Sequence, residues 1–549
     1  MQVQVSKPTL FKSIFVTEIT LLIGGFDTGF ALLNHKALCN IIPIMNNHYN
    51  AIIIGSGVTG MTAALHLAER GLKPLILEAD ERVGGRLSGK EDILVNDWRF
   101  PNEHGVHGIW SSYVNFKSML KRHEILPKLI PAKEEQWIYR TGNFIGRAPI
   151  GSTIRNSLIP APFHYIQLFL LPQFLWMIDI RDWASLLSIW STLVMAIGVD
   201  PFVEDQPLKD LTFGKELKRW GPAMRSLFFG LTRNGLSTDP DQVPLAGFLA
   251  FLRFYTLMRR DAWKFDYLPN GGGEVCEKLS ARIIQLGGEI RLESRVLRIH
   301  ASREGDWIAH IQRDGLTESA HAPFVILATD SPAAESIIRN SFPTEKFFFP
   351  HGLAHAVIRL WFDREPRKHP EAGIFSGDFI MHNFFWLDKI YESYRKWHKE
   401  TGGSCIEVHV YGPADVLKKG DAILLTSVLT DFYRAFPELK GHLIKPHIQR
   451  NAATHTLPAL GARGTHLGIE TPWENLFCAG DWVRHETPAF FLERACVTGI
   501  EAANHILRER GLDEYDLQSY PPPEPLVAWI ESLMMRGRKE RRRKKKVVS

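Results

Sequence analysis

AIIIGSGVTGMTAALHLAERGLKPLILEADERVGGR, residues 51–86, is the stretch that decides the fold. Its first four residues, Ala51–Ile54, form an unbroken apolar run typical of a buried parallel strand. A glycine-rich turn at 55–60 follows, and Met61–Arg70 has the composition of a helix. Lys73–Leu77 predicts a second strand. This order of elements predicts a βαβ unit within a parallel sheet.

The glycines of the turn have separate physical roles. Gly55 permits the tight turn out of the strand, Gly57 lets the backbone approach a pyrophosphate, and Gly60 lets the helix pack closely on the sheet. The helix start favours phosphate through its free N–H groups and dipole. Glu78, 23 residues after the first glycine, is placed to bind a ribose lacking a 2′-phosphate. We therefore expect an adenine dinucleotide at Gly55, Ser56, Gly57, Val58, Thr59, Gly60, Glu78 and Ala79.

Two further motifs bear on the choice of dinucleotide. Gly84-Gly85-Arg86 resembles the extended motif of the glutathione-reductase-type flavoproteins, which implies that Gly85 and Arg86 hold the pyrophosphate of FAD. Near the other end, the apolar run Asn475–Cys478 leads into Gly480-Asp481, and a helix is expected over Ala495–Leu507. Asp481 can accept hydrogen bonds from polyol hydroxyls, and the helix dipole favours a reduced flavin. The cofactor expected is FAD.

The middle of the chain contains elements suited to a return to the same sheet. Glu274–Gln285 predicts a helix, followed by strands at Glu289–Leu292, Arg295–Ile299 and Phe324–Ala328. We expect an α/β fold, a Rossmann-like FAD-binding domain with an inserted α+β substrate domain. The FAD-binding domain is assigned to 45–100, 264–330 and 471–512, and the substrate domain, which faces the membrane, to 101–263 and 331–470.

Composition excludes several classes of function. The chain has 549 residues and a net charge of +5, but residues 536–546 contain nine Lys or Arg and one Glu. The rest has 56 basic and 59 acidic residues, so no basic face for nucleic acid is indicated. Five scattered cysteines without a CxxC pair indicate neither a disulfide framework nor a metal site.

Several apolar segments indicate a membrane surface. Residues 183–199 carry no charge, which fits buried core helices, helices that dip into one leaflet and admit an apolar substrate, or a true span, although seventeen residues are fewer than the twenty or so that a spanning helix usually needs. After a proline-rich link in 513–549, the apolar Leu526–Met535 directly precedes the basic segment, a pattern of attachment to acidic lipids, with a solvated tail as the alternative. The expected location is the cytoplasmic side of a membrane, peripheral or monotopic. Residues 1–44 are either a targeting extension or a segment before a true start at Met45.

The motifs together resemble the FAD-dependent carotenoid desaturases of the amine oxidase and phytoene desaturase superfamily. The resemblance spans about 48–510 and adds Asn102–Gly108, Leu268–Gly273, Ala479–Trp482 and Leu492–Gly499. Within it, Glu103–Gly108 and Leu492–Gly499 are most similar to the β-carotene desaturases, which include enzymes of the isorenieratene synthase type. A Met-Glu-Gly-Ala sequence common in phytoene desaturases is replaced here by Leu492–Ala495. The resemblance implies cofactor contacts at Glu103, His104, Gly105, Val296, Gly480 and Asp481.

The resemblance implies desaturation of a long isoprenoid, with a hydride passing to flavin N5 and a proton leaving to a base or to water. His104 and His107 are the candidate catalytic residues, and Phe490 and Phe491 are candidates for the wall of a substrate channel. Three alternatives stay open: oxidation of an amine or porphyrinogen, redox removal of the hydroxyl of a squalene-type alcohol, and a flavin-binding isoprenoid carrier without turnover. The sequence leaves the electron acceptor open between a quinone and oxygen.

Overall fold

The computed structural model describes residues 48–202 and 207–534. The described residues all fall within one unit of the chain, residues 45–549. The expected N-terminal extension and the basic segment 536–546 both lie outside the described residues. All described helices and strands therefore belong to the unit that begins at Met45.

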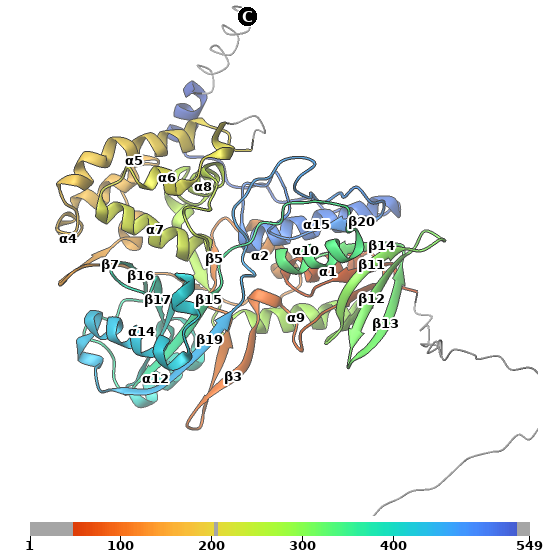
Figure 1. The fold of residues 1–549 in the computed structure, drawn as a ribbon, viewed down its shortest axis with the longest axis horizontal. Helices are drawn as coiled ribbons and strands as arrows, with labels where there is room; N and C mark the ends of the chain where they lie inside the picture. The colour runs from red at the N-terminus through yellow and green to blue at the C-terminus, as the bar shows by residue number, and fades with distance from the viewer. Residues whose placement is uncertain (1–47, 203–206, 535–549) are drawn as a thin grey trace, which may run out of the picture. The chain divides into compact units, whose positions relative to one another are not determined.

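The predicted βαβ unit forms the centre of a five-stranded parallel sheet (Figure 1). Its order is β10 (Glu289–Arg291), β2 (Pro74–Leu77), β1 (Ala51–Ile54), β14 (Phe324–Leu327) and β20 (Leu476–Cys478). Four of these strands are buried along their whole length, which explains their unbroken apolar sequences. Because β20 comes from the C-terminal part of the chain, the sheet includes strands from both ends of the described unit.

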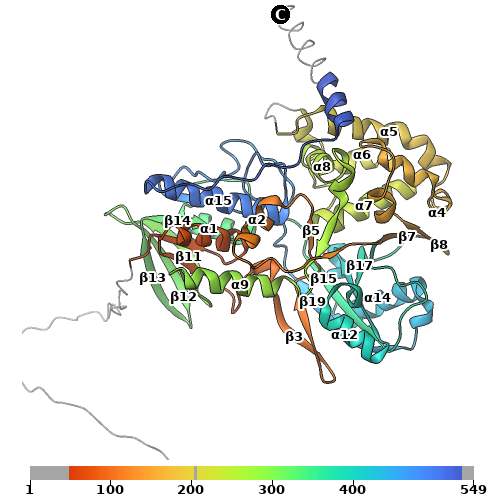
Figure 2. The same ribbon diagram turned by 180° about the vertical axis from the view of Figure 1, so that it is seen from behind.

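Three helices pack together beside this sheet. The helix α1 (Val58–Glu69) follows β1 and contacts both α15 (Phe491–Glu509) and α9 (Gly272–Gln285), and it lies between them in both views (Figures 1 and 2). Gly60 makes close packing with β1 possible, since a Cβ there would come within 1.9 Å of the Gly55 carbonyl oxygen. Position 60, in the first turn of α1, therefore requires glycine so that the helix can lie close to the end of β1.

One predicted strand belongs to a different sheet. Arg295–Ile299 was expected beside the parallel strands, but β11 (Arg295–Ala301) forms an antiparallel sheet with β12 (Trp307–Arg313) and β13 (Leu316–Ala322). Only Val296 and Ile299 of β11 are buried, the one-sided pattern of an antiparallel strand. The helix α10 (Ser331–Ser341) packs against β11.

A second, seven-stranded sheet lies beside this part of the unit (Figure 1). Its order is β19 (Leu443–Asn451), β15 (His355–Phe362), β18 (Ser404–Val410), β17 (Asn383–Trp386), β16 (Ala372–Gly377), β7 (Glu135–Thr141) and β8 (Phe144–Pro149). One face packs an apolar core against α14 (Asp421–Ala435). The opposite face of β15 and β18 carries Arg359, Glu407 and His409, all of them buried.

A group of helices precedes α9 in the chain, with α5 (Ile180–Gly198) the longest among them. A capping box of Asp179 and Asp182 starts α5. Among the described helices, α5 alone is long and apolar enough to cross a membrane, and 33% of its apolar window is buried. The others in the group are α3 (Gly151–Arg155), a 3₁₀ turn (Phe163–Leu170), α4 (Pro172–Leu175), α6 (Phe213–Leu217), α7 (Pro222–Leu236) and α8 (Leu245–Leu252).

The smaller elements connect these layers. One is a hairpin of β3 (Gly89–Val95) with β4 (Trp98–Glu103). Another is a three-stranded sheet in the order β5 (Gly108–Trp110), β9 (Phe265–Tyr267) and β6 (Ile130–Pro131), in which β9 comes from a later part of the chain. The remaining helices are α2 (Val114–Arg122), α11 (Leu387–Ile390), α12 (Glu392–Thr401) and α13 (Ala414–Leu417). The last described helix, Pro525–Met534, contacts the end of α5, where Met534 lies against Gly198.

Candidate functional site

A single cavity of about 520 Å³ joins the glycine-rich turn after β1 to the polar face of the seven-stranded sheet. It begins at the carboxyl ends of parallel strands, where open α/β sheets bind ligands. Most of the predicted site residues line it: Gly55, Gly57, Val58, Thr59, Glu78, Ala79, Gly85, Arg86, His104, Gly105, His107, Val296, Gly480, Asp481 and Phe491.

Four predicted site residues lie behind the cavity wall. Ser56 donates to Glu78 from its backbone N and its hydroxyl, and Gly60 packs under Gly55. The Glu103 carboxylate accepts from the amides of Gly272 and Gly273 at the start of α9, so it caps a helix and makes no cavity contact. The Phe490 ring is buried under the Arg494 guanidinium, 4.5 Å from its centroid, so these four residues do not line the cavity, and the contacts expected of them stay predictions.

The start of α1 fits a phosphate. Gly57 occupies the N-cap position and no side chain caps the helix there. A Cβ on Gly57 would meet no atom within 4 Å, while a Cβ on Gly85 would lie 3.5 Å from the Gly57 Cα. The two glycines therefore leave room on the cavity side, and uncapped helix N–H groups favour an anion in that space.

Glu78 and the start of β11 fit the adenosine end of a dinucleotide. The Glu78 carboxylate is held by Ser56 and by the backbone N of Asp80, at 2.9 Å. It lines the cavity with Ser294, Arg295 and Val296. Val296 lies next to a register shift in β11, which turns this backbone away from regular pairing.

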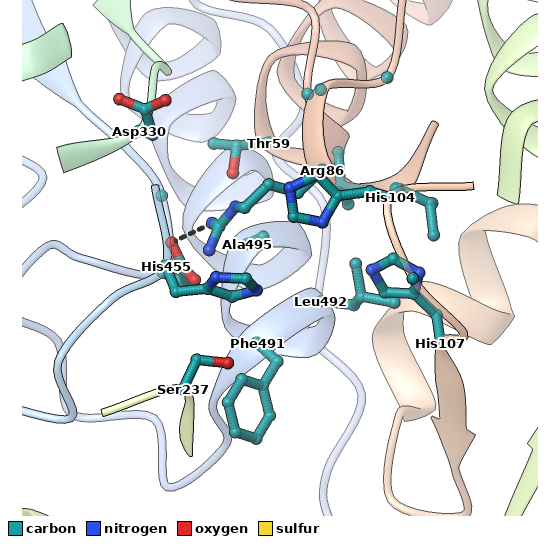
Figure 3. Close-up of a pocket in the computed structure, with 18 of the residues that line it drawn as sticks. Thr59, Arg86, His104, His107, Ser237, Asp330, His455, Phe491, Leu492 and Ala495 are labelled. Atoms are coloured by element: carbon teal, nitrogen blue, oxygen red, sulfur yellow. Dashed lines mark hydrogen bonds and ion pairs between the residues drawn. The ribbon is translucent and has the colours of Figure 1, made fainter. Parts of the chain in front are cut away.

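Arg86 connects the first motif to the last. Its Nη2 lies 2.8 Å from Asp481 Oδ1, the dashed line that starts at Arg86 in Figure 3, although the two residues are 395 positions apart. Thr456 donates to the same oxygen at 3.0 Å. Burial opposes the charge on Arg86, but the Asp481 carboxylate outweighs it, so the pKa of Arg86 is raised. This fixed cation on the cavity wall suits a ligand with negative phosphates.

The helix expected near the flavin begins earlier than predicted. The start of α15 is Phe491, four residues before Ala495, and Leu492 and Ala495 face the cavity beside Phe491 (Figure 3). Phe491 has a φ of 58°, a conformation unusual for a bulky residue. The positive end of the helix dipole thus points at the cavity, as expected for stabilising a reduced flavin.

Histidines gather where the cavity meets the seven-stranded sheet. The ring of His104 lies 5.3 Å from that of His355 and 5.5 Å from that of His455, and His104 and His455 flank Arg86 in the cavity (Figure 3). Burial and the neighbouring histidines and Arg86 hold the pKa of His104 and of His455 well below the usual value. Burial lowers the pKa of His107 to about 4. These rings are therefore neutral at pH 7.

Several cavity residues were missed by sequence reasoning, namely His355, His409, Tyr411 and His455. Three of them belong to buried strands or their ends, where polar side chains alternate with apolar ones. In β18, Ile406 and Val408 face the core while Glu407 and His409 face the opposite side. This alternation of polar and apolar residues in an otherwise apolar strand could have predicted a polar surface on one face of the sheet, because buried polar groups need partners.

No group of three or more His, Cys, Asp or Glu side chains among residues 48–202 and 207–534 is arranged to hold a metal ion. Cys276, Cys405, Cys478 and Cys496 are free and buried, and Cys39 lies outside the described residues. At its dinucleotide end the cavity is lined by glycine backbone, by the Glu78 carboxylate and by the Arg86–Asp481 pair.

Comparison with known proteins gives a family match. The family model described as flavin containing amine oxidoreductase matches residues 58–507. The chain is 23% identical to the carotenoid phi-ring synthase of Chlorobaculum tepidum, covering 86% of this chain and 90% of the relative. It is also 23% identical to the 15-cis-phytoene desaturase of an Oncidium hybrid cultivar, covering 83% and 78%.

Solved structures share the fold. Cyclohexylamine oxidase from Brevibacterium oxydans superposes with a TM-score of 0.62 at 16% identity, over 85% of this chain and 100% of that one. Putrescine oxidase superposes with a TM-score of 0.61 at 14% identity, over 84% and 99%. At such identities the likeness concerns the fold, and it confirms the predicted arrangement of an FAD-binding Rossmann-like part with a substrate part.

Proposed function

Because this chain belongs to the family of flavin-containing amine oxidoreductases and is an FAD-dependent oxidoreductase, we propose that it desaturates a long isoprenoid of the carotenoid class. Two kinds of relative support the substrate class, since the names of the matched proteins include carotenoid phi-ring synthases and phytoene desaturases. The identity of 23% leaves the particular reaction as our proposal.

The cavity carries this proposal. Beyond the dinucleotide end, the part of the cavity that we call the chamber has mainly aromatic and aliphatic walls, formed by Trp110, Tyr113, Leu231, Phe251, Trp263, Phe265, Ile374, Phe385 and Phe491. Apolar walls bind a hydrocarbon by removing it from water, at roughly 25 cal/mol per Å². The neutral histidines at the chamber's inner end add no charge that would have to be desolvated when such a substrate enters.

The residues have separable roles in this reaction. FAD, when bound, supplies the two-electron acceptor. Gly57, the N-terminus of α1 and Arg86 would hold its phosphates, Glu78 its ribose, and the start of α15 its ring. The aromatic walls orient the chain of the substrate and exclude water, which protects a carbocation-like centre from hydration.

We further propose that the molecule works at the cytoplasmic face of a membrane, as a peripheral or monotopic protein. Apolar side chains are exposed along α5 and the segments before it, with Leu158 90%, Leu187 84% and Trp176 81% exposed. The helix Pro525–Met534 adds Trp529, 60% exposed. Arg253 pairs with Glu531 and so fixes this helix to the end of α8, close to α5 (Figure 2). Exposed patches of this kind are rare on freely soluble proteins.

The direct test is anaerobic mixing of the FAD-loaded protein with a panel of carotenes, squalene-type alcohols and amines. We expect carotenes to bleach the flavin absorbance and to yield a product with two fewer hydrogens. Bleaching by amines alone would refute the carotenoid assignment. No bleaching by any member of the panel, with the flavin still reducible by dithionite, would favour the carrier without turnover.

A further inference from the structure

We propose that Tyr411, His409 and Glu407 form a proton relay on the chamber wall, with Tyr411 as the residue that meets the substrate. The inference rests on the proposed function, because desaturation releases a proton as well as a hydride. Each desaturation breaks two C–H bonds. One hydrogen leaves as hydride to FAD, the other leaves as a proton, and the electron pair of the second bond becomes the new double bond.

The inner end of the relay is a permanently charged carboxylate. Glu407 is fully buried, and its Oε2 lies 2.7 Å from Nη2 of the equally buried Arg359. Its Oε1 accepts from the backbone N of Val106 at 2.9 Å. Although burial opposes the charge, Arg359 and His409 lower the pKa of Glu407 to about 2. Glu407 is therefore an acceptor at every working pH.

This carboxylate fixes the tautomer of His409. His409 Nε2 lies 2.7 Å from Glu407 Oε1, so the proton of the neutral imidazole is on Nε2. His409 Nδ1 is then an acceptor, and the Tyr411 hydroxyl, 3.1 Å away, donates to it. Both His409 and Tyr411 line the cavity. The Tyr411 hydroxyl thus connects the chamber to His409 Nδ1, which can accept a proton.

The neighbouring His355 is fixed in the opposite sense. Arg359 has only donors, so it orients Gln449 with Oε1 toward itself and Nε2 toward Asn451 Oδ1. Asn451 Nδ2 then donates to the His104 carbonyl oxygen and to His355 Nε2, at 2.8 and 2.9 Å. His355 already has its Nε2 lone pair occupied, and its proton is on the buried Nδ1, for which the described residues provide no partner.

The other histidines of the chamber are also poor sites for an added proton. His104 and His455 face the Arg86 cation and each other, and His107 faces Arg86 as well as Glu407. His382, buried behind the wall near Tyr411, faces Arg233. Of the histidines that line the cavity, only His409 has a ring nitrogen hydrogen-bonded to a carboxylate, which would pair with the charge once a proton is added. Among the cavity histidines, His409 is therefore the favourable site for the proton. His355 stacks on the Tyr411 ring but makes no hydrogen bond to its hydroxyl that would let it take this proton.

In the proposed step, the substrate C–H proton bonds to the Tyr411 oxygen while the Tyr411 proton passes to His409 Nδ1. The positive charge that forms on His409 is paired with Glu407. Tyr411 regains its original protonation state, and Ser237, which hydrogen-bonds the same phenol, helps to hold it in place. Burial raises the pKa of Tyr411, so the hydroxyl remains protonated before the step.

The experiment compares Tyr411→Phe and His409→Gln with His355→Gln, which changes the same residue type in the same chamber. Anaerobic flavin reduction by a carotene is followed against pH and in D₂O. We expect the first two variants to react about 10²-fold more slowly, the usual worth of general-base catalysis. They should also lose the acid limb of the pH profile and the solvent isotope effect. His355→Gln should keep both.

A second measurement does not depend on turnover. In the FAD-loaded, oxidised protein labelled with ¹⁵N-histidine, the signal that disappears in His409→Gln should show the Nε2–H tautomer at neutral pH. An Nδ1–H tautomer would overturn the relay, as would unchanged rates and pH profiles in Tyr411→Phe and His409→Gln. If the wild type itself is not bleached by carotenes while the fold and flavin are intact, the proposed function fails. That outcome is distinct from a bleached wild type with unaffected variants, which refutes the relay alone.

Discussion

At the scale of single residues, an added methyl group should have opposite effects at Gly57 and Gly60, although only three positions separate them: weaker FAD binding at Gly57 and lower stability at Gly60. A Cβ on Gly57 meets no protein atom within 4 Å and its φ of −64° suits any residue. Gly57→Ala should therefore leave the unfolding temperature of the cofactor-free protein unchanged. It should raise the Kd for FAD about tenfold, or about 1.4 kcal/mol, because the methyl group enters the phosphate space.

Gly60→Ala is the matched control, with the same added methyl group. Here the Cβ would lie 1.9 Å from the Gly55 carbonyl oxygen, so α1 must move away from β1. We expect a loss of about 1–3 kcal/mol in the free energy of unfolding, even without FAD. Calorimetry and FAD titration of both variants check the pair. Equal destabilisation by the two substitutions would contradict the assignment of Gly57 to binding.

At the scale of elements, Glu103 makes the stability of the α9 start depend on pH. Burial raises the pKa of its carboxyl to about 7, while the Gly272 and Gly273 amides and Arg359 oppose this. The folded protein then holds a proton that the unfolded chain, with a pKa near 4.5, releases. The proton on Glu103 therefore adds its full share to the free energy of unfolding below pH 4.5, and this share is lost as the pH rises to about 7.

Glu103→Gln removes this titration. The difference in unfolding free energy between wild type and variant should therefore change by up to about 3 kcal/mol between pH 4.5 and 7, and level off above. Urea unfolding at a series of pH values measures it. A difference that stays constant across this range would show that Glu103 is ionised in the folded protein throughout.

The elements also show how far the sequence alone reaches. The strands β1, β2 and β14 were predicted to within one residue, because a buried parallel strand needs an unbroken apolar run and the glycine turn marks its end. β11 was assigned to the wrong sheet, since a short strand has no local signal for its partner. The start of α15 was missed because Phe491 adopts a positive φ.

The sequence predicted the dinucleotide end of the site but not the chamber, because only the dinucleotide end depends on local sequence. Glycine spacing reports a local backbone requirement, so Gly57 and Gly85 were found without knowledge of the tertiary fold. The chamber depends on pairing between β15 and β18, whose facing residues, such as Arg359 and Glu407, are far apart in sequence. Only the alternation of Glu407 and His409 with apolar residues in β18 hinted at that surface.

At the scale of the whole described unit, the site exists only when distant segments meet. Arg86 pairs with Asp481 in the segment after β20, and Glu493 on α15 accepts from Asn115 on α2, so the C-terminal part of the unit is joined to its N-terminal part at two points. The chamber adds strands from the seven-stranded sheet and the end of α8. The apolar face of α5 lies near α8, which places a hydrocarbon-rich surface close to the part of the chain that walls the chamber.

This arrangement predicts that the exposed face of α5 binds membranes through its side chains. Leu187 is 84% exposed, so Leu187→Asp should not change the free energy of unfolding but should weaken binding to phospholipid vesicles. The loss of one inserted leucine is worth about 2 kcal/mol, or roughly 30-fold in affinity. Leu316→Asp is the matched control, because Leu316 is 65% exposed on β13 in the separate antiparallel sheet.

Vesicle flotation with phosphatidylcholine alone and with added phosphatidylglycerol separates the apolar from the electrostatic contribution. The basic residues of 536–546 should strengthen binding to the acidic vesicles in a salt-dependent way, at about 1 kcal/mol for each residue near the surface. Replacing them with Gln should remove the preference for acidic lipid and keep the effect of Leu187. Equal loss of vesicle binding in Leu187→Asp and Leu316→Asp would refute α5 as the docking face. No binding by the wild type to either vesicle would refute the membrane location, because both the apolar face and the basic segment would then be without effect.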